Sequence, residues 1–220
     1  RHSFPTRRSS DLLCDMLLEI HPKNPDVRKI NMVLDCLRKG GIIVYPTDTI
    51  YGLGCSIEHS DAITRICKIK HIQSEKALLS FICSDLSHLS EYTKSIDTPI
   101  YRFLKQYLPG PFTFILAASK KTPKLLRTKK ETVGIRVPDN NIAREIVKLL
   151  GNPIVSTSIH DEDEVIEYST DPELIFEKWN NKVDLVIDGG YGDNVASTII
   201  DLTGYEPEVI REGKGSLDVL

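Results

Sequence analysis

The sequence Tyr45-Pro46-Thr47-Asp48-Thr49-Ile50-Tyr51-Gly52-Leu53-Gly54 is the most informative stretch of this chain. An apolar strand over residues 42–45 leads into it, and Pro46 ends that strand because proline lacks the backbone N–H that a sheet needs. Glycine allows close backbone approach, and threonine hydroxyls at a strand end can hold a small polar ligand beyond the sheet. These residues alone are equally consistent with a ligand-binding turn and with an ordinary strand–turn.

Apolar strands and amphipathic helices intermix on both sides of this segment. The pattern predicts strands over residues 17–20, 42–45, 78–83, 112–117, 133–137, 153–156 and 183–187, and a hairpin of 198–202 with 208–211. It predicts helices over residues 26–39, 61–70, 87–92, 98–106, 140–150 and 171–179. Asp26 and Asp61 are the expected caps of the first two helices. Because there is no repeat or linker, the sequence predicts one α/β (α+β) domain, a mixed β-sheet with helices packed on it.

The bulk composition excludes several classes of protein. A net charge of −3 gives no sign of nucleic-acid binding by the whole chain, so such a partner would need a local basic patch. No apolar run approaches the roughly 20 residues that cross a bilayer, which argues against a membrane partner. The five cysteines lack the spacing of a zinc site, and their odd number suits reduced thiols. We therefore expect a soluble, cytoplasmic protein without a structural metal.

Residues 1–15 differ in character from the rest of the chain. They lack both the apolar stretch and the small-residue cleavage site of a signal peptide. They resemble a translated sequencing adapter, which is a contaminant of assembled reads. We therefore interpret residues 1–15 as a non-native N-terminal artefact, expect the natural chain to start near Met16, and assign residues 16–220 to the domain.

Two groups of basic residues have both a ligand-binding and a structural explanation. Lys68, Lys70 and Lys76 bracket the step from a helix to a strand and could hold phosphates. Taken alone, they are better explained as a solvated helix end, where lysines suit the negative end of the dipole.

Arg136 lies inside the apolar segment 134–138, where a charge needs a carboxylate or phosphate partner. A bound ligand and a structural ion pair are equally open there.

The strand over residues 153–156 ends in hydroxyl side chains that lead to His160. That pattern fits a ligand site at the carboxyl edge of a sheet, although a lone histidine is more often an ordinary surface residue. The following run Asp161-Glu162-Asp163-Glu164 could hold a metal ion or form a solvated acidic loop. We expect the loop, because no second histidine or cysteine is nearby.

One strong basic patch lies between residues 120 and 130. It contains no acid, and its basic residues are Lys120, Lys121, Lys124, Arg127, Lys129 and Lys130. Such a patch could bind an RNA backbone electrostatically. The lack of interleaved aromatic residues argues against base stacking. A soluble, mobile loop is the alternative, and it is slightly favoured by this feature alone.

The order of the motifs is more informative than any one of them. After Tyr45–Gly54 and the lysine-rich helix end come Pro109-Gly110-Pro111-Phe112-Thr113-Phe114, Gly134-Ile135-Arg136-Val137-Pro138, Val155-Ser156-Thr157-Ser158 and Val209-Ile210-Arg211-Glu212-Gly213. This series, from about Ile30 to Gly215, resembles the YrdC-like family, which includes threonylcarbamoyl-AMP synthases. The resemblance implies a twisted mixed β-sheet of the YrdC-like double-stranded-RNA-binding fold, with a concave, partly basic face.

The resemblance also implies an activity. The synthases convert ATP, L-threonine and bicarbonate to threonylcarbamoyl-adenylate and pyrophosphate, with Mg²⁺ on the triphosphate. The adenylate feeds tRNA threonylcarbamoyladenosine modification, so double-stranded RNA or tRNA is the implied macromolecular partner. Catalysis would rest on positioning and charge neutralisation, and no catalytic residue is assigned.

Site residues follow from the matching motif positions. The implied substrate-binding residues are Thr47, Lys76, Arg136 and Ser158. The implied nucleotide-binding residues are Lys70, Thr113, His160, Ser169 and Arg211. The guanidinium of Arg136 would clamp the threonine carboxylate with its bidentate fork. The basic patch of residues 120–130, which is identified by its charge and not by a motif, is the candidate RNA contact.

Two motifs depart from the synthase pattern. The synthases carry Lys-x-Arg where this chain has Lys70-His71-Ile72, and Ser-x-Asn where it has Ser158-Ile159-His160. Both changes resemble the YciO branch of the family. The resemblance therefore implies either a weak or altered synthase, or a non-catalytic or altered-substrate RNA-binding protein of the YciO type.

Overall fold

The computed structural model describes residues 17–71, 79–87, 89–123, 126, 128, 130–160 and 170–216. Its strands are β1 Leu17–Glu19, β2 Ile42–Tyr45, β3 Gly52–Ser56, β4 Ser80–Ile82, β5 Phe112–Ala117, β6 Thr132–Arg136, β7 Ile154–Ser158, β8 Leu185–Asp188, β9 Thr198–Asp201 and β10 Glu208–Arg211. Its helices are α1 Val27–Arg38, α2 Ser60–Ile69, α3 Leu89–Tyr92, α4 Thr98–Tyr107, α5 Asn141–Leu150 and α6 Pro172–Trp179. The segment 1–15 that we interpret as non-native lies outside the described residues.

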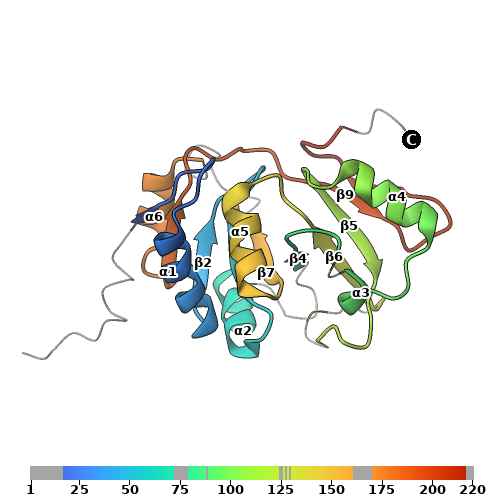
Figure 1. The fold of residues 1–220 in the computed structure, drawn as a ribbon, viewed down its shortest axis with the longest axis horizontal. Helices are drawn as coiled ribbons and strands as arrows, with labels where there is room; N and C mark the ends of the chain where they lie inside the picture. Colours follow the sequence, from blue (N-terminus) through green and yellow to red (C-terminus); the bar gives the residue numbers. More distant parts are fainter. Residues whose placement is uncertain are drawn as a thin grey trace, which may run out of the picture.

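All ten described strands form one sheet in the order β1-β8-β2-β3-β7-β4-β6-β5-β9-β10 (Figure 1). The pairs β1/β8, β2/β8, β4/β6 and β5/β9 are parallel, whereas β2/β3, β3/β7, β4/β7, β5/β6 and β9/β10 are antiparallel. The predicted single α/β domain with a mixed sheet is therefore confirmed, as is the β9–β10 hairpin. Among the described residues, no helix is long and apolar enough to cross a membrane.

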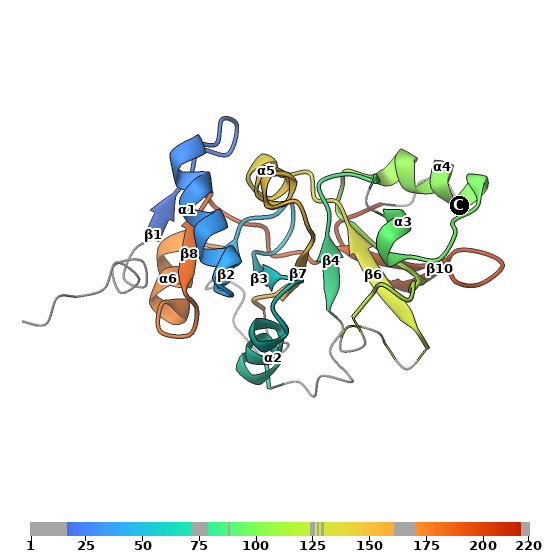
Figure 2. The ribbon, with the colours of Figure 1, turned by 60° about the horizontal axis from the view of Figure 1, so that its bottom comes forward.

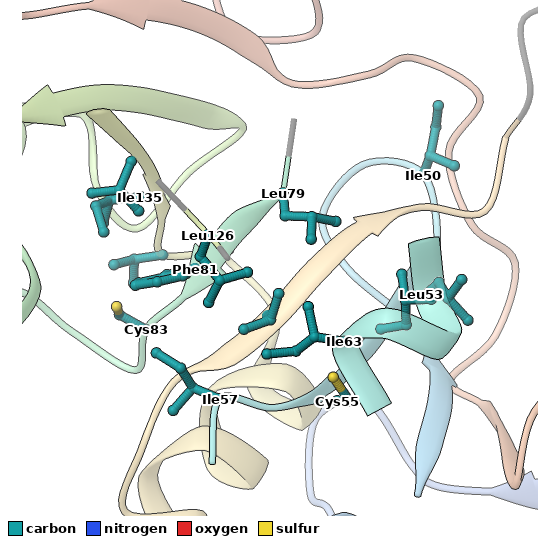
Figure 3. Packing of buried hydrophobic residues seen from close by; sticks show 14 of the residues in the cluster. Ile50, Leu53, Cys55, Ile57, Ile63, Leu79, Phe81, Cys83, Leu126 and Ile135 are labelled. Carbon is teal, nitrogen blue, oxygen red and sulfur yellow. The ribbon is translucent and has the colours of Figure 1, made fainter. Parts of the chain in front are cut away.

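The two faces of the sheet carry different helices because strand side chains alternate between faces. Ile43 and Tyr45 of β2 join a buried cluster with α1 and α5. Ile42 and Val44 join a larger cluster on the other face, which contains residues of α2, α4 and α6. Helices α1 and α5 lie side by side on one side of the strands and α2 on the other (Figure 2). Figure 3 shows part of the larger cluster, which includes Ile63 of α2.

Helices α1 and α5 cover only part of their face of the sheet. Their cluster includes side chains of β1, β2 and β8 and reaches as far as Ile154 of β7 and Ile82 of β4. On the strands beyond, the side chains that point to this same face include Thr113 of β5 and Arg136 of β6. This uncovered half of the face is the position of the candidate site.

The sequence analysis missed strand β3 and treated Gly52–Gly54 as part of a turn. In the structure, the turn ends before Gly52, and β3 pairs with both β2 and β7. Glycine is depleted in strands, which hid this element. Here it has a packing reason: a Cβ at residue 52 would lie 2.8 Å from the Tyr45 ring, and one at residue 54 would lie 2.5 Å from Cγ2 of Ile154.

The cap expected for α1 is present, whereas the cap expected for α2 is not. Asp26 accepts backbone N–H bonds at the start of α1, as expected. Helix α2 instead begins at Ser60 after His59, which makes no side-chain capping bond. Asp61 lies in the first turn of α2, so its assignment as the cap was wrong. A carboxylate there still favours the helix, because it faces the positive end of the dipole.

Candidate functional site

A cavity of about 260 Å³ lies on the uncovered half of the sheet. Strands β3, β4, β5, β6, β7, β9 and β10 all contribute to its lining. Its polar lining residues are Thr47, Thr49, Ser80, Thr113, Thr128, Thr132, Arg136, Ser156, Thr157, Ser158, Ser197 and Arg211. Its apolar lining residues include Leu79, Ile115, Ile199 and Ile210. The cavity thus combines two cations with many hydroxyls, and no carboxylate lines it among the described residues.

Arg136 is buried at the end of β6 and is held by the turn that follows β2. Its Nη2 donates to Oγ1 of Thr49 at 2.7 Å and to Oγ1 of Thr47 at 3.2 Å. The same nitrogen forms an ion pair with Oδ1 of Asp48. The structural ion pair that the sequence left open is therefore present. The Nε–H of Arg136 is also buried but has no partner in the described part of the chain.

Thr47 is the hydroxyl that organises this turn. Its Oγ1 donates to the carbonyl of Ile50 at 2.8 Å and accepts the backbone N–H of Thr49 at 3.0 Å. Both bonds close the turn locally, in the manner of a hydroxyl that replaces a backbone group. Thr47 therefore lies in the cavity wall with a fixed hydroxyl, in contact with Arg136.

A second polar group consists of Thr113 of β5, Ser197, which directly precedes β9, and Arg211 of β10. The hydroxyls of Thr113 and Ser197 are 2.9 Å apart. Nη2 of Arg211 donates to the carbonyl of Ser197 at 2.8 Å. Burial lowers the pKa of Arg211 from its ordinary value, and the nearby positive charge of Arg136 lowers it further. Among the described residues, no acidic side chain lines the cavity, so the two arginines favour an anion between them.

Lys70 and His160 lie at the β7 end of the site, outside the cavity lining. Nζ of Lys70 donates to the carbonyl of His160 at 3.0 Å. Oγ of Ser158 donates to the same carbonyl at 3.4 Å. Nδ1 of His160 is buried without a partner in the described residues. The structure thus brings Thr47, Thr113, Arg136, Ser158 and Arg211 together around one cavity, with Lys70 and His160 beside it.

Several expected residues cannot be placed. Lys76, Ser169, Lys124, Arg127 and Lys129 lie outside the described residues, as do Ile72 and the acidic run 161–164. The described members of the basic patch, Lys120, Lys121 and Lys130, are exposed on the connection between β5 and β6. That connection also contributes Thr128 to the cavity wall.

Sequence reasoning missed Asp48, Thr49 and Ser197. The first two were within the quoted segment, but their contact with Arg136 spans almost ninety positions and no local pattern signals it. The alternation of side chains along the strands was the sequence signal that could have placed the strand residues of the cavity on one face. Thr113 and Ile115 on β5 and Gly134 and Arg136 on β6 are spaced by two, which places each pair on one face.

The described residues offer no protein metal site. Within the described ranges, no group of three or more histidine, cysteine, aspartate or glutamate side chains could hold a metal ion.

Comparisons with known proteins agree with this fold. Residues 35–213 match the family model of Sua5, YciO and YrdC, described as "Telomere recombination". The uncharacterized protein YciO of Escherichia coli is 44% identical over 199 residues, which cover 90% of this chain and 95% of that protein. The threonylcarbamoyl-AMP synthase of Coxiella burnetii is 31% identical over 165 residues, covering 75% of this chain and 87% of that protein.

Two solved structures share this fold. The crystal structure of E. coli YciO superposes with a TM-score of 0.85 at 41% identity, covering 93% of this chain and 98% of that one. The crystal structure of Pyrococcus abyssi Sua5 complexed with L-threonine superposes with a TM-score of 0.81 at 27% identity. It matches 90% of this chain but 57% of the longer Sua5 chain.

Proposed function

Because this chain belongs to the Sua5/YciO/YrdC family, we propose that it is a threonylcarbamoyl-AMP synthase-type protein that joins L-threonine, bicarbonate and ATP. The observation that carries this proposal is the single cavity that Arg136 and Arg211 both line. Arg136 is on β6 and Arg211 on β10, three strand positions apart in the sheet. At about 4.8 Å per strand, that separation allows an amino acid beside one arginine and a nucleotide phosphate beside the other.

The proposed reaction consumes no external oxidant or reductant. The amine of L-threonine attacks the carbon of bicarbonate, and water leaves to give a carbamate. A carbamate oxygen then attacks the α-phosphorus of ATP, a new P–O bond forms, and the bond to the β-phosphate oxygen breaks. Pyrophosphate leaves with that electron pair, so atoms and charges balance.

The side chains would act by binding and charge neutralisation rather than by proton transfer. Arg136 suits the threonine carboxylate, because its buried Nε–H has no partner among the described residues and a carboxylate oxygen would satisfy it. Arg211 suits the α-phosphate, where negative charge collects as pyrophosphate departs. The hydroxyls of Thr113 and Ser197 lie between them and could bind phosphate or ribose oxygens. Ser158 lines the cavity and could contact the substrate, and Lys70 and His160 lie beside it. Lys76 and Ser169 are assigned to substrate and nucleotide binding by the family resemblance alone.

We expect slow turnover. Isoleucine at residue 72 and histidine at residue 160 replace the arginine and asparagine of the synthase motifs. A lost guanidinium–phosphate contact is worth roughly 2–5 kcal/mol where it is desolvated. Activity should therefore survive at a reduced rate if Arg136 and Arg211 carry binding.

Threonine-dependent pyrophosphate release tests the proposal. Purified protein with ATP and bicarbonate should release pyrophosphate when L-threonine is added, and Arg136→Met should abolish the dependence. Arg102→Met is the matched control, because Arg102 is exposed on α4 and does not line the cavity. Pyrophosphate release that is absent at high protein concentration, or identical without threonine, would refute the synthase proposal.

A second candidate function is RNA binding, favoured by the position of the basic patch. Lys120, Lys121 and Lys130 are exposed on the connection that also supplies Thr128 to the cavity. RNA bound there would lie at the cavity rim. Affinity for duplex RNA or tRNA should fall steeply with salt. It should also fall when all six basic residues of the patch are neutralised, and unchanged affinity in that variant would exclude the patch.

A further inference from the structure

All hydrogen bonds that Arg136 makes within the described residues leave from one nitrogen. Nη2 serves Thr47, Asp48 and Thr49, whereas the buried Nε–H has no partner. A guanidinium is planar and has five N–H donors. Fixing Nη2 therefore fixes the direction of the remaining donors as well. A buried donor without a partner is costly unless a ligand satisfies it.

Asp48 is itself held from several sides. Its Oδ1 pairs with Arg136, and its Oδ2 accepts the backbone N–H of Asp139 at 3.1 Å. Its main-chain oxygen accepts a bond from Nζ of Lys214 at 2.7 Å. The side chains of Arg136 and Asp48 are only 10% and 9% exposed. The carboxylate therefore has little freedom to swing away from the guanidinium.

Lys214, in the segment after β10, connects Asp48 with Asp193. Its Nζ forms an ion pair with Oδ2 of Asp193 at 2.7 Å, and the backbone N–H of Asp193 donates to the carbonyl of Thr49 at 3.2 Å. Asp48, Asp193 and Lys214 line a neighbouring hollow of about 460 Å³ and do not line the cavity. Asp48 contacts Arg136, which does line the cavity, and would act on a ligand there through that guanidinium.

We propose that Asp48 is the positioning residue for Arg136, turning its free N–H donors toward a substrate carboxylate in the cavity. The identity of that carboxylate as L-threonine rests on the proposed function, whereas the positioning rests on the contacts above. Asparagine at residue 48 keeps the shape of the side chain and an acceptor oxygen but loses the charge. The guanidinium should then lose its fixed orientation.

The first test needs no substrate. The Nε–H signal of Arg136 is followed by nuclear magnetic resonance in the ligand-free protein and assigned by its absence in Arg136→Lys. The wild-type signal should be resolved and slow to exchange with water, and Asp48→Asn should make it exchange faster. An unchanged signal in Asp48→Asn would overturn the proposal. Asp184→Asn is the control, because Asp184 also pairs with an arginine, Arg65, but away from the cavity.

The second test uses calorimetry with L-threonine and with L-threoninol, which lacks the carboxylate. Asp48→Asn should weaken L-threonine binding about tenfold or more, since small misplacements of a clamp are costly. It should leave the weaker L-threoninol binding unchanged. Equal losses for both ligands would indicate a merely structural role and overturn the proposal. If wild-type protein binds no L-threonine, the proposed function fails, and the ligand-free test still decides whether Asp48 orients Arg136.

Discussion

The ring of Tyr45 occupies the space that a side chain at residue 52 would need. The two residues are register partners of β2 and β3, and a Cβ on Gly52 would lie 2.8 Å from the ring. The Tyr45 ring is fully buried, and its hydroxyl donates to Oγ of Ser156 at 2.7 Å behind the cavity wall. Both ends of the quoted segment therefore support the same wall of the site.

Gly52→Ala should destabilise the protein by about 1–3 kcal/mol, because overpacking displaces the buried Tyr45 ring. Urea unfolding measures the free-energy change. Gly204→Ala is the matched control, since its new Cβ would meet only the carbonyl oxygen of Glu206 at 3.6 Å. A Gly52→Ala variant as stable as the Gly204→Ala variant would contradict the packing account.

Arg136→Met should lower the free energy of unfolding by about 3–5 kcal/mol, because it leaves the buried carboxylate of Asp48 without its cation. The double variant Arg136→Met/Asp48→Asn should recover part of this loss. Lys148→Met is the control, because Lys148 pairs with Glu145 on the exposed surface of α5. That change should cost no more than about 1 kcal/mol. A double variant no more stable than the single one would argue against a buried charge pair.

Alkaline pH should destabilise the protein through Tyr45. Burial raises the pKa of Tyr45 from 10.0 to about 12. Because the folded pKa is the higher one, this contribution is complete below pH 10 and is lost as the pH rises toward about 12. The full two-unit shift corresponds to roughly 3 kcal/mol. Urea unfolding across this range should show a smaller decline for Tyr45→Phe, and equal declines would contradict the assignment.

The ion pair of Lys214 with Asp193 should be visible in the titration of the carboxyl. The hydrogen bond from Lys214 is the largest cause that lowers the pKa of Asp193 below its ordinary value. Because the folded pKa is lowered, the contribution is present above the ordinary value of 3.8 and is lost as the pH falls through the folded pKa. Lys214→Met should raise the pKa of Asp193 in a resonance titration. An unchanged pKa would show that the pair does not form in solution.

Arg211→Met should weaken the binding of ATP without a similar effect on the binding of L-threonine. We expect ATP binding to weaken about tenfold or more, since a hydrogen bond to a charged group is worth about 1.5–3 kcal/mol. L-threonine binding should change by much less, because the proposed contact of its carboxylate is Arg136 and not Arg211. Calorimetry with each ligand separately measures both, with Arg102→Met as the control. Equal weakening of both ligands would contradict the separation.

Local patterns predicted most elements because their periodicity is strong. Strand β2 and helix α1 were found close to their bounds, from a buried apolar run and an amphipathic stretch capped by Asp26. Strand β3 was missed because Gly52 and Gly54 resemble a turn. Only the position of the Tyr45 ring across the sheet explains those glycines, and that is long-range information.

The family resemblance grouped residues that the fold brings to one cavity, which no single residue could do. Thr113, Arg136 and Arg211 are far apart in sequence yet line one cavity. The departures at Ile72 and His160 indicated the YciO branch, in agreement with the 44% identity to YciO. The partner of Arg136 could not be predicted, because the contact with Asp48 joins segments that only the sheet brings together.

Transfer of labelled carbon from bicarbonate tests the central claim most directly. The protein is incubated with ATP, L-threonine and carbon-13 bicarbonate, and the nucleotide products are analysed by mass spectrometry. The account predicts a labelled threonylcarbamoyl-adenylate that disappears in Arg136→Met and persists in Arg102→Met. Pyrophosphate release without a labelled adenylate, or no labelled product at high protein concentration, would contradict it.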